Sequence, residues 1–213
     1  MVTQLLESAR GKIRAALTGR QKVTDLMRAV YRRVRDSYEG LLHTRRRRAA
    51  GARLQRVAPV NSVLFICHGN ICRSSYAEFA FRRQAGRADQ LVVSSAGFVG
   101  PDRQPPSLAL QAALRRGLDM RDHRSRLLTQ PMLDEAEIIV VMSAEQAAIV
   151  QRRVRRDAVV ILGDLDPLPV TQRTIRDPWN GDADVFEASY ARIDRCLPAL
   201  MLAIGEAPNA KCE

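Results

Sequence analysis

The chain has 213 residues, enough for one well-buried domain with an appendage but too few for two full-sized domains. Hydrophobic residues make up 46% and charged residues 27% of the chain, which is typical of globular proteins and excludes a fibrous or wholly disordered chain. The net charge of +11 lies entirely in residues 1–60, where 15 Lys and Arg stand against four acidic residues, so the remaining chain has no overall bias towards polyanions.

The basic N-terminal part carries helical patterns. Apolar residues recur at three- and four-residue steps over residues 22–44 and predict an amphipathic helix, whose other face mixes Arg with Asp and Glu. A weaker helical pattern covers residues 5–17. The four arginines of residues 45–48, followed by Ala-Ala-Gly-Ala, predict a linker or a frayed helix end. We expect a basic helical extension over residues 1–58 and a separate domain over residues 59–213.

From Ser62 onwards, strand patterns alternate with helix patterns. The predicted strands are short apolar runs rich in β-branched residues, over residues 63–66, 91–93, 137–142 and 158–162. The predicted helices cover residues 74–83 and 108–116, the stretch from the third strand to residue 153, and residues 183–204. Continuous apolar strands that alternate with helices predict an α/β fold, with a four-stranded parallel sheet flanked by helices on both faces.

The turn between the first predicted strand and its helix carries the chemistry. It contains Cys67, five further residues and Arg73. A cysteine attacks as its thiolate, which a helix N-terminus and a nearby guanidinium both stabilise. Backbone N–H groups of a tight loop at a helix N-terminus bind a phosphoryl dianion, and Arg73 adds a planar bidentate donor. We predict a phosphate-binding loop with Cys67 as its nucleophile, rather than a buried cysteine that ends a strand by chance.

The loop residues have separate expected tasks. Gly69 is expected to adopt backbone angles closed to other residues, and Asn70 tolerates the left-handed region better than most residues do. Ser74 is expected to donate its hydroxyl to the thiolate. The complete phosphate-binding loop is predicted to comprise, besides Cys67 and Arg73, the residues His68, Gly69, Asn70, Ile71, Cys72 and Ser74.

The segment from Val63 to Ser74, followed by Ala77 and Glu78, resembles the low-molecular-weight protein tyrosine phosphatases. The resemblance extends from about Ser62 to the C-terminus and excludes the segment before about residue 58. It implies the phosphotyrosine protein phosphatase I-like fold. Its further landmarks are Ser94–Gly97, His123–Arg126, Val141–Met142 and Asp177–Pro178.

The resemblance implies a two-step hydrolysis that needs no metal and no cofactor. Cys67 attacks phosphorus and forms a phosphocysteine, while Asp177 protonates the leaving oxygen and later acts as base for a water. Arg73 and the loop amides hold the phosphoryl oxygens. Such a reaction needs a general acid, although Asp177–Pro178 also fits a simple turn dipeptide.

Other residues are implied to shape the site. Family positions that support the loop by hydrogen bonds correspond to Asn70, Ser74, Ser95 and His123, and His123 equally fits a purely structural histidine. Trp179 is expected either to form a cleft wall that stacks on an aromatic ring or simply to pack. The short segment from Phe98 to Pro106 leaves the opposite wall open, with Phe98 a weak candidate for it.

Three chemistries share this scaffold: tyrosine phosphatase, arginine phosphatase and arsenate reductase. The resemblance implies that Ile71 matches the tyrosine phosphatases. At the same position it implies Thr in arginine phosphatases and Ser in thiol-coupled arsenate reductases. The arsenate reductases also need a cysteine pair that residues 131–165 lack. The expected partner is a phosphotyrosine-containing protein, and the relatives imply a bacterial tyrosine kinase. Arsenate reduction is kept as an alternative function.

A phosphotyrosine-binding module with little turnover is the alternative of a different class. Its only support is that Ser75 replaces a proline of the family and Asn180 an aromatic residue. Cys72 is open to two interpretations that do not exclude each other. The resemblance implies a reversible disulfide with Cys67, and burial as a small residue behind the loop also fits.

The compartment and the extension are predicted more coarsely. The chain has four cysteines, too few for a disulfide framework, and no bilayer-spanning apolar run or secretory signal, so we expect a cytoplasmic protein. For residues 22–48 the hypotheses are docking on the domain or a helix-mediated dimer, peripheral contact with an anionic membrane, and binding of a partner macromolecule. We expect no nucleic-acid binding, because no recognised motif is present.

Overall fold

The computed structural model of the chain describes residues 27, 38, 40–85, 91–154, 157 and 159–206. The chain divides into two compact units, Met1–Leu42 and His43–Glu213. In the first unit the described residues are helical. The helix predicted over residues 5–17 lies outside the described residues, as does most of the helix predicted over residues 22–44.

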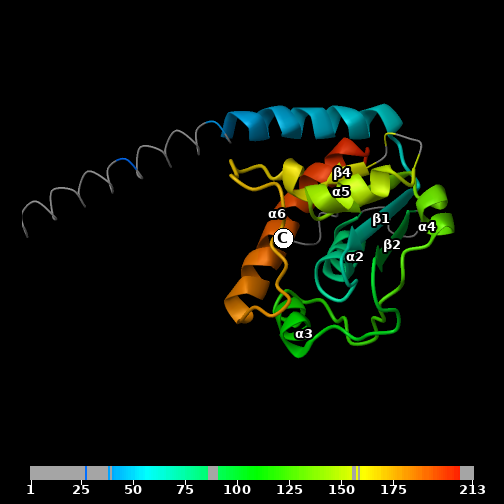
Figure 1. Cartoon of the computed structure of the whole chain (residues 1–213), viewed down its shortest axis with the longest axis vertical. Helices are drawn as coiled ribbons and strands as arrows, with labels where there is room; N and C mark the ends of the chain where they lie inside the picture. The colour runs from blue at the N-terminus through cyan, green and yellow to red at the C-terminus, as the bar shows by residue number, and fades with distance from the viewer. Residues whose placement is uncertain are drawn as a thin grey trace, which may run out of the picture. The chain divides into compact units, whose positions relative to one another are not determined.

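The second unit is built on a four-stranded parallel sheet in the order β2-β1-β3-β4 (Figure 1). The strands are β1 (Ser62–Cys67), β2 (Val92–Gly97), β3 (Ile138–Val141) and β4 (Val159–Ile161). The predicted fold class is confirmed. β2 extends beyond the predicted apolar run, because Ser94 and Ser95 pair with Leu64 and Phe65 of β1.

Besides a helix that ends at Val57, the described part of the chain has five α-helices and one 3₁₀ helix around the sheet. They are α2 (Arg73–Gln84), α3 (Ser107–Leu114), α4 (Gln130–Glu135), α5 (Ala144–Gln151), η1 (Leu162–Leu165) and α6 (Ala183–Ala203). The sequence predicted four of them and missed α4 and η1. These two have six and four residues, too few to show a helical period. None of the described helices is both long enough and apolar enough to cross a bilayer.

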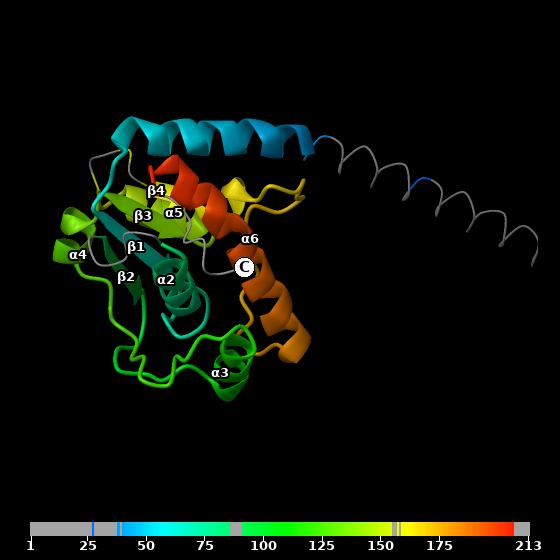
Figure 2. The ribbon, with the colours of Figure 1, turned by 180° about the vertical axis from the view of Figure 1, so that it is seen from behind.

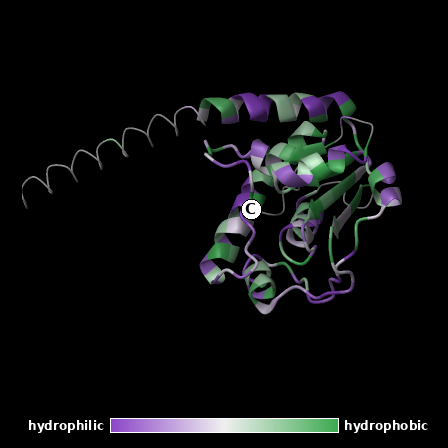
Figure 3. Cartoon of the chain, in the orientation of Figure 1, coloured by the Kyte–Doolittle hydropathy of each residue, from purple (hydrophilic) through white to green (hydrophobic). Residues whose placement is uncertain are grey.

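Both faces of the sheet are buried, as the continuous apolar strands predicted. Side chains alternate between the faces, so that Val63 and Phe65 join one cluster while Leu64 and Ile66 join another. The first cluster contains residues of α2, α3 and α6, and the second contains residues of α4 and α5. Figures 1 and 2 show the sheet from its two sides, and Figure 3 shows the strands largely in the colour of hydrophobic residues.

Residues 40–57 are helical, so the prediction of a linker or frayed end after the arginine run is wrong. Within the second unit, residues 43–57 contribute Leu54, which is fully buried, and Ala50 to the same cluster as Phe65. Nε2 of the buried His43 lies 2.8 Å from the carbonyl oxygen of Asp166. Tertiary packing therefore stabilises this helix where composition alone suggests fraying.

Asp166, which follows η1 in the chain, connects η1 to α6 through side-chain hydrogen bonds. Its fully buried carboxylate accepts hydrogen bonds from Arg195 at 2.8 Å and from Arg192 at 3.1 Å. Burial raises the pKa of this carboxyl, but the hydrogen bonds and charges of the arginines outweigh burial and lower the pKa overall. Arg192 also donates to the carbonyl oxygens of Gln172 and Thr174, and so holds the segment that leads to Asp177.

The order of the strands in the sheet indicates where a ligand site should lie. β1 is followed along the chain by β2 on one side, and β3 pairs on its other side, so the strand order reverses at β1. In open parallel sheets, ligands bind beyond the carboxyl ends of the strands at such a point. Cys67 ends β1, and the N–H of Ile175 donates to the carbonyl oxygen of Met142, just after β3, at 2.9 Å. The segment carrying Asp177 is thereby held beside the loop that follows β1.

Candidate active site

The loop between β1 and α2 turns sharply at Asn70. Asn70 has φ +53°, whereas Gly69 does not have a positive φ. The left-handed conformation expected of Asn70 is therefore confirmed, and the special backbone angles expected of Gly69 are wrong. Gly69 instead leaves room for the Arg103 side chain, since a Cβ there would lie 2.9 Å from Nη2 of Arg103 and would require that guanidinium to shift.

The end of β2 supports the loop through a close backbone approach. A Cβ on Gly97 would lie 2.8 Å from the backbone nitrogen of Asn70 and 2.9 Å from the carbonyl oxygen of His68. The N–H of Phe98 donates to the same His68 oxygen at 2.8 Å. Only glycine at position 97 lets the loop lie against the strand at this distance.

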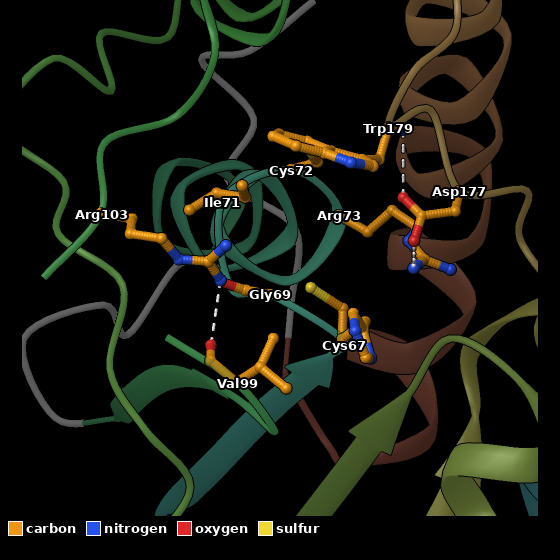
Figure 4. Close-up of a pocket in the computed structure, with 10 residues that line it drawn as sticks. Cys67, Gly69, Ile71, Cys72, Arg73, Val99, Arg103, Asp177 and Trp179 are labelled. Carbon is orange, nitrogen blue, oxygen red and sulfur yellow. Dashed lines mark hydrogen bonds and ion pairs between the residues drawn. The ribbon is translucent and has the colours of Figure 1, made fainter. Parts of the chain in front are cut away.

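A cavity of about 180 Å³ opens at the carboxyl end of β1 (Figure 4). Eight residues that the sequence placed in the site line it: Cys67, His68, Gly69, Ile71, Cys72, Arg73, Asp177 and Trp179. The structure therefore brings together a thiol, a guanidinium and a carboxyl from distant parts of the chain. Asn70, Ser74, Ser95 and His123 do not line the cavity but are buried beneath it.

The sulfur of Cys67 accepts two hydrogen bonds. The backbone N–H of Asn70 lies 3.2 Å from Sγ and the hydroxyl of Ser74 lies 3.0 Å from it. The residue is 2% exposed. Hydrogen bonds to a charged group are stronger than those between neutral groups, so both donors can stabilise negative charge on this sulfur during a reaction.

The Asn70 amide orients the Ser74 hydroxyl. Its Nδ2 donates to Ser74 at 3.0 Å and to Ser95 at 2.7 Å. With their oxygens accepting from Asn70, the two hydroxyls direct their own protons onward, Ser74 to Cys67 and Ser95 to Glu78 at 2.5 Å. No sequence pattern assigned a role to Glu78, and the spacing of α2 alone could not show that it faces Ser95.

Two further contacts fix Asn70. Its Oδ1 accepts from the N–H of Arg126 at 2.8 Å, and its carbonyl oxygen lies 2.7 Å from Nε2 of His123. Burial lowers the pKa of His123, against the opposite effects of the bond to Asn70 and the nearby Glu78 carboxylate. Arg126 also pairs with Glu78 at 3.3 Å. The loop is therefore held by a polar network in which Ser95, His123 and Arg126 come from parts of the chain distant from Asn70.

Arg73 and Asp177 form an ion pair through Nη2 and Oδ2. Nη1 of Arg73 donates to the carbonyl oxygen of Ile175 at 3.1 Å, while its buried Nε has no hydrogen-bond partner among the described residues. A buried donor without an acceptor is costly, and a phosphoryl oxygen would supply the missing acceptor. The Asp177 side chain is 41% exposed, so it can reach a substrate.

The outer walls of the cavity come from two segments. Trp179 is 52% exposed, and its backbone N–H donates to Oδ1 of Asp177 at 3.2 Å. On the other side, Val99 and Arg103 line the cavity. Phe98, the weak candidate for this wall, instead packs against the cluster under α4 and α5. Arg103 carried no sequence pattern that singled it out.

The remaining cysteines differ in environment. Cys67, Cys72 and Cys196 are free thiols. The pKa of Cys72 is raised well above its usual range, first by burial and then by the negative charge of Cys67 and Asp177. Burial raises the pKa of Cys196 to about 12, which leaves it protonated and unreactive at neutral pH. Cys212 lies outside the described residues.

Chemically, the arrangement suits in-line attack on a phosphoryl group. A thiol lies at the end of a strand, a helix N-terminus and a guanidinium can supply donors, and a carboxyl lies across the cavity. Ser75, where the family was expected to have proline, is buried and its hydroxyl donates to the carbonyl oxygen of Cys72 at 3.2 Å. The changed residue therefore adds a hydrogen bond in the first helical turn.

Comparison with known proteins gives consistent matches. The family model described as low molecular weight phosphotyrosine protein phosphatase matches residues 62–210. The probable low molecular weight protein-tyrosine-phosphatase EpsP of Ralstonia solanacearum is 30% identical over 142 residues, covering 66% of this chain and 93% of that protein. The Homo sapiens low molecular weight phosphotyrosine protein phosphatase is 32% identical, with coverages of 66% and 93%.

A solved structure agrees with these sequence matches. The Erwinia amylovora tyrosine phosphatase amsI superimposes with a TM-score of 0.60 at 26% sequence identity. The match covers 68% of this chain and 93% of the other. The matched family model begins at residue 62, so residues 1–61 precede it.

Proposed function

Because this chain belongs to the low molecular weight phosphotyrosine protein phosphatase family, we propose that it hydrolyses phosphotyrosine in proteins through a phosphocysteine on Cys67. The observation that supports this most is the convergence of Cys67, Arg73 and Asp177 on one cavity. Nucleophile, anion donor and general acid are the three groups that the reaction needs.

In the first step, the Cys67 thiolate attacks phosphorus in line with the leaving phenolate oxygen. The S–P bond forms as the P–O bond breaks, and protonated Asp177 gives its proton to the leaving oxygen. Arg73 exchanges its bond to Asp177 for the phosphoryl oxygens, using Nε and Nη2 as a bidentate donor.

In the second step, Asp177 takes a proton from water, which attacks phosphorus and displaces the thiolate. The S–P bond breaks, and inorganic phosphate leaves. The hydroxyl of Ser74 and the N–H of Asn70 stabilise the thiolate as leaving group, as they stabilise it as nucleophile. The buried network below Asn70 keeps these donors in place, so little reorganisation is needed during turnover.

The aromatic leaving group is accommodated by Trp179, whose exposed indole can stack on a tyrosine ring at the cavity mouth. The proposed substrate is therefore a phosphotyrosine-containing protein. A bacterial tyrosine kinase is the proposed partner, on the strength of the bacterial relatives alone.

We assign a targeting or regulatory role to the exposed surface of the extension, proposed as residues 1–58, whereas its buried Ala50 and Leu54 belong to the core shared with the catalytic domain. Arg45, Arg47 and Arg48 are exposed on their helix. An exposed cluster of arginines favours peripheral contact with an anionic membrane. A helix-mediated dimer through residues 22–48 is the competing proposal. Measuring sedimentation of the full chain with and without anionic vesicles separates the two.

The function is tested by hydrolysis of p-nitrophenyl phosphate with a chelator present. We expect turnover by the wild type, none by Cys67→Ser, and a loss of about 10²–10⁴-fold in kcat for Asp177→Asn, which keeps the shape of the side chain but has no acidic proton. A folded wild type without turnover would refute the enzyme hypothesis. Binding of a phosphotyrosine peptide by that inactive protein would then support the binding module.

A further inference from the structure

Arg103 lies in the wall of the cavity and has no role in the two chemical steps. It belongs to the segment between β2 and α3, and its guanidinium lies on the side of the cavity away from Asp177 (Figure 4). It is a second arginine in the same cavity as Arg73, and it comes from a different part of the chain.

The guanidinium is held in place by backbone carbonyl groups. Nε donates to Gly100 at 3.0 Å, and Nη2 donates to Val99 at 2.9 Å and to Gly69 at 3.0 Å. Two glycines leave the space for it. A Cβ on Gly69 would lie 2.9 Å from Nη2, and a Cβ on Gly100, whose φ is +59°, would overlap the guanidinium. Arg103 is therefore pre-organised before any substrate binds.

The charge of Arg103 has no counterion among the described residues. Carbonyl oxygens satisfy hydrogen bonds but do not neutralise a positive charge, and no described carboxylate forms an ion pair with Arg103. The other arginines close to the loop differ, since Arg73 pairs with Asp177 and Arg126 pairs with Glu78. Three of the five N–H groups of Arg103 donate to carbonyls, which leaves the two on Nη1 for an external acceptor.

The position of Arg103 indicates which acceptor it serves. Its Nη2 binds the carbonyl oxygen of Gly69. In a loop that binds an anion, the N–H groups face the anion and the carbonyls face away. Arg103 therefore lies outside the phosphate cradle, beside the place where the residues next to a bound phosphotyrosine must pass.

We propose that Arg103 is a specificity residue that binds a carboxylate flanking the phosphotyrosine, so that the preferred substrates are acidic phosphotyrosine segments. This inference rests on the proposed phosphatase function. An arginine fixed by carbonyls loses little side-chain entropy on binding, and a carboxylate matches its planar donor geometry. A neutral or basic flanking residue would leave the Arg103 charge uncompensated.

The test uses the full chain and two phosphotyrosine peptides that differ only in having Glu or Gln on both sides of the phosphotyrosine. The variants are Arg103→Gln, which removes the charge, and Arg103→Lys, which keeps it. Arg152→Gln is the matched control, because Arg152 is exposed at the end of α5, outside the cavity, and the variant loses the same charge. The readout is the ratio of kcat/KM for the Glu peptide to that for the Gln peptide.

We expect the wild type to prefer the Glu peptide about five-fold, mainly through KM, at an ionic strength of about 50 mM. Arg103→Gln should bring the ratio to about one, Arg103→Lys should retain part of the preference, and Arg152→Gln should keep all of it. Raising the salt to about 500 mM should reduce the wild-type ratio, since screening weakens exposed charge pairs.

Two outcomes overturn the inference. One is a wild type that hydrolyses both peptides with equal kcat/KM. The other is an Arg103→Gln variant that loses activity on both peptides, and on p-nitrophenyl phosphate, by the same factor, because Arg103 would then act on the loop or on the phosphoryl group itself. A wild type that hydrolyses none of the three substrates refutes the proposed function, and the inference with it.

Discussion

Asn70 is the residue whose replacement most directly tests how the loop is held. It is fully buried, it has φ +53°, and its side chain makes three hydrogen bonds, to Ser74, Ser95 and Arg126. At about 1 kcal/mol each, loss of these bonds in Asn70→Gly should lower the free energy of unfolding by about 3 kcal/mol. Asn70→Ala should lower it by about 4 kcal/mol, because alanine also resists the left-handed conformation by roughly 1 kcal/mol.

Asn180 provides the matched control. It has φ +63° but is exposed, and its side chain makes no hydrogen bond to the residues that the structure describes. Asn180→Gly should therefore leave the free energy of unfolding within about 0.5 kcal/mol of wild type, and Asn180→Ala should cost roughly 1 kcal/mol. Chemical unfolding followed by circular dichroism measures all four variants under the same conditions.

Activity provides a second readout for Asn70. Without its amide, the Ser74 hydroxyl no longer points at the Cys67 sulfur, so kcat for an aryl phosphate should fall by about ten-fold or more in both Asn70 variants. The reasoning is refuted if Asn70→Gly unfolds with the same free energy as wild type. Equal stabilities of Asn70→Gly and Asn70→Ala would refute the contribution assigned to the backbone conformation alone.

Two further predictions concern the domain boundary and the effect of pH. Deleting residues 1–58 should prevent stable folding, because it removes the buried Leu54, whose side chain alone contributes about 2–5 kcal/mol to stability. Deleting residues 1–42 should allow folding, because the helical residues 43–57 remain. Melting curves and p-nitrophenyl phosphate turnover compare the two deletions, and a stable, active chain that lacks residues 1–58 contradicts the prediction. Burial lowers the pKa of His123 below 6.5, so its contribution to stability is complete above pH 6.5 and is lost as the pH falls through the lowered pKa. Between pH 7.5 and pH 5, the free energy of unfolding should therefore fall less in His123→Gln than in wild type. Equal decreases in the two proteins contradict this prediction.

Local patterns in the sequence were enough for the parts of this protein that are continuous along the chain. The strand before Cys67, the tight turn, Arg73 and the start of a helix are neighbours in sequence, so hydrophobic periodicity and the chemistry of the motif predicted both the sheet and the nucleophile. The left-handed conformation of Asn70 was predictable for the same reason, since it is a local preference of that residue type.

The roles proposed for Asp177 and Trp179 needed more than the local pattern. An Asp-Pro pair is a common turn, and only the resemblance to a family distinguished Asp177–Pro178 from Asp166–Pro167. In the structure the two aspartates have different surroundings. Asp177 lines the cavity, and Asp166 is a buried partner of two α6 arginines. Nothing in either dipeptide encodes that difference.

Only the tertiary structure decided which residues surround the loop. Glu78, Arg103 and Arg126 lie next to it because strand order and helix packing bring them there, and each is an ordinary polar residue in its own segment. The same holds for residues 43–57, whose helix is stabilised by burial of Leu54 in the core. The sequence by itself determined the sheet and the loop that carries Cys67 and Arg73, since these depend on neighbouring residues. The supporting network and the cavity walls depend on contacts between segments far apart in the chain, which no local pattern records.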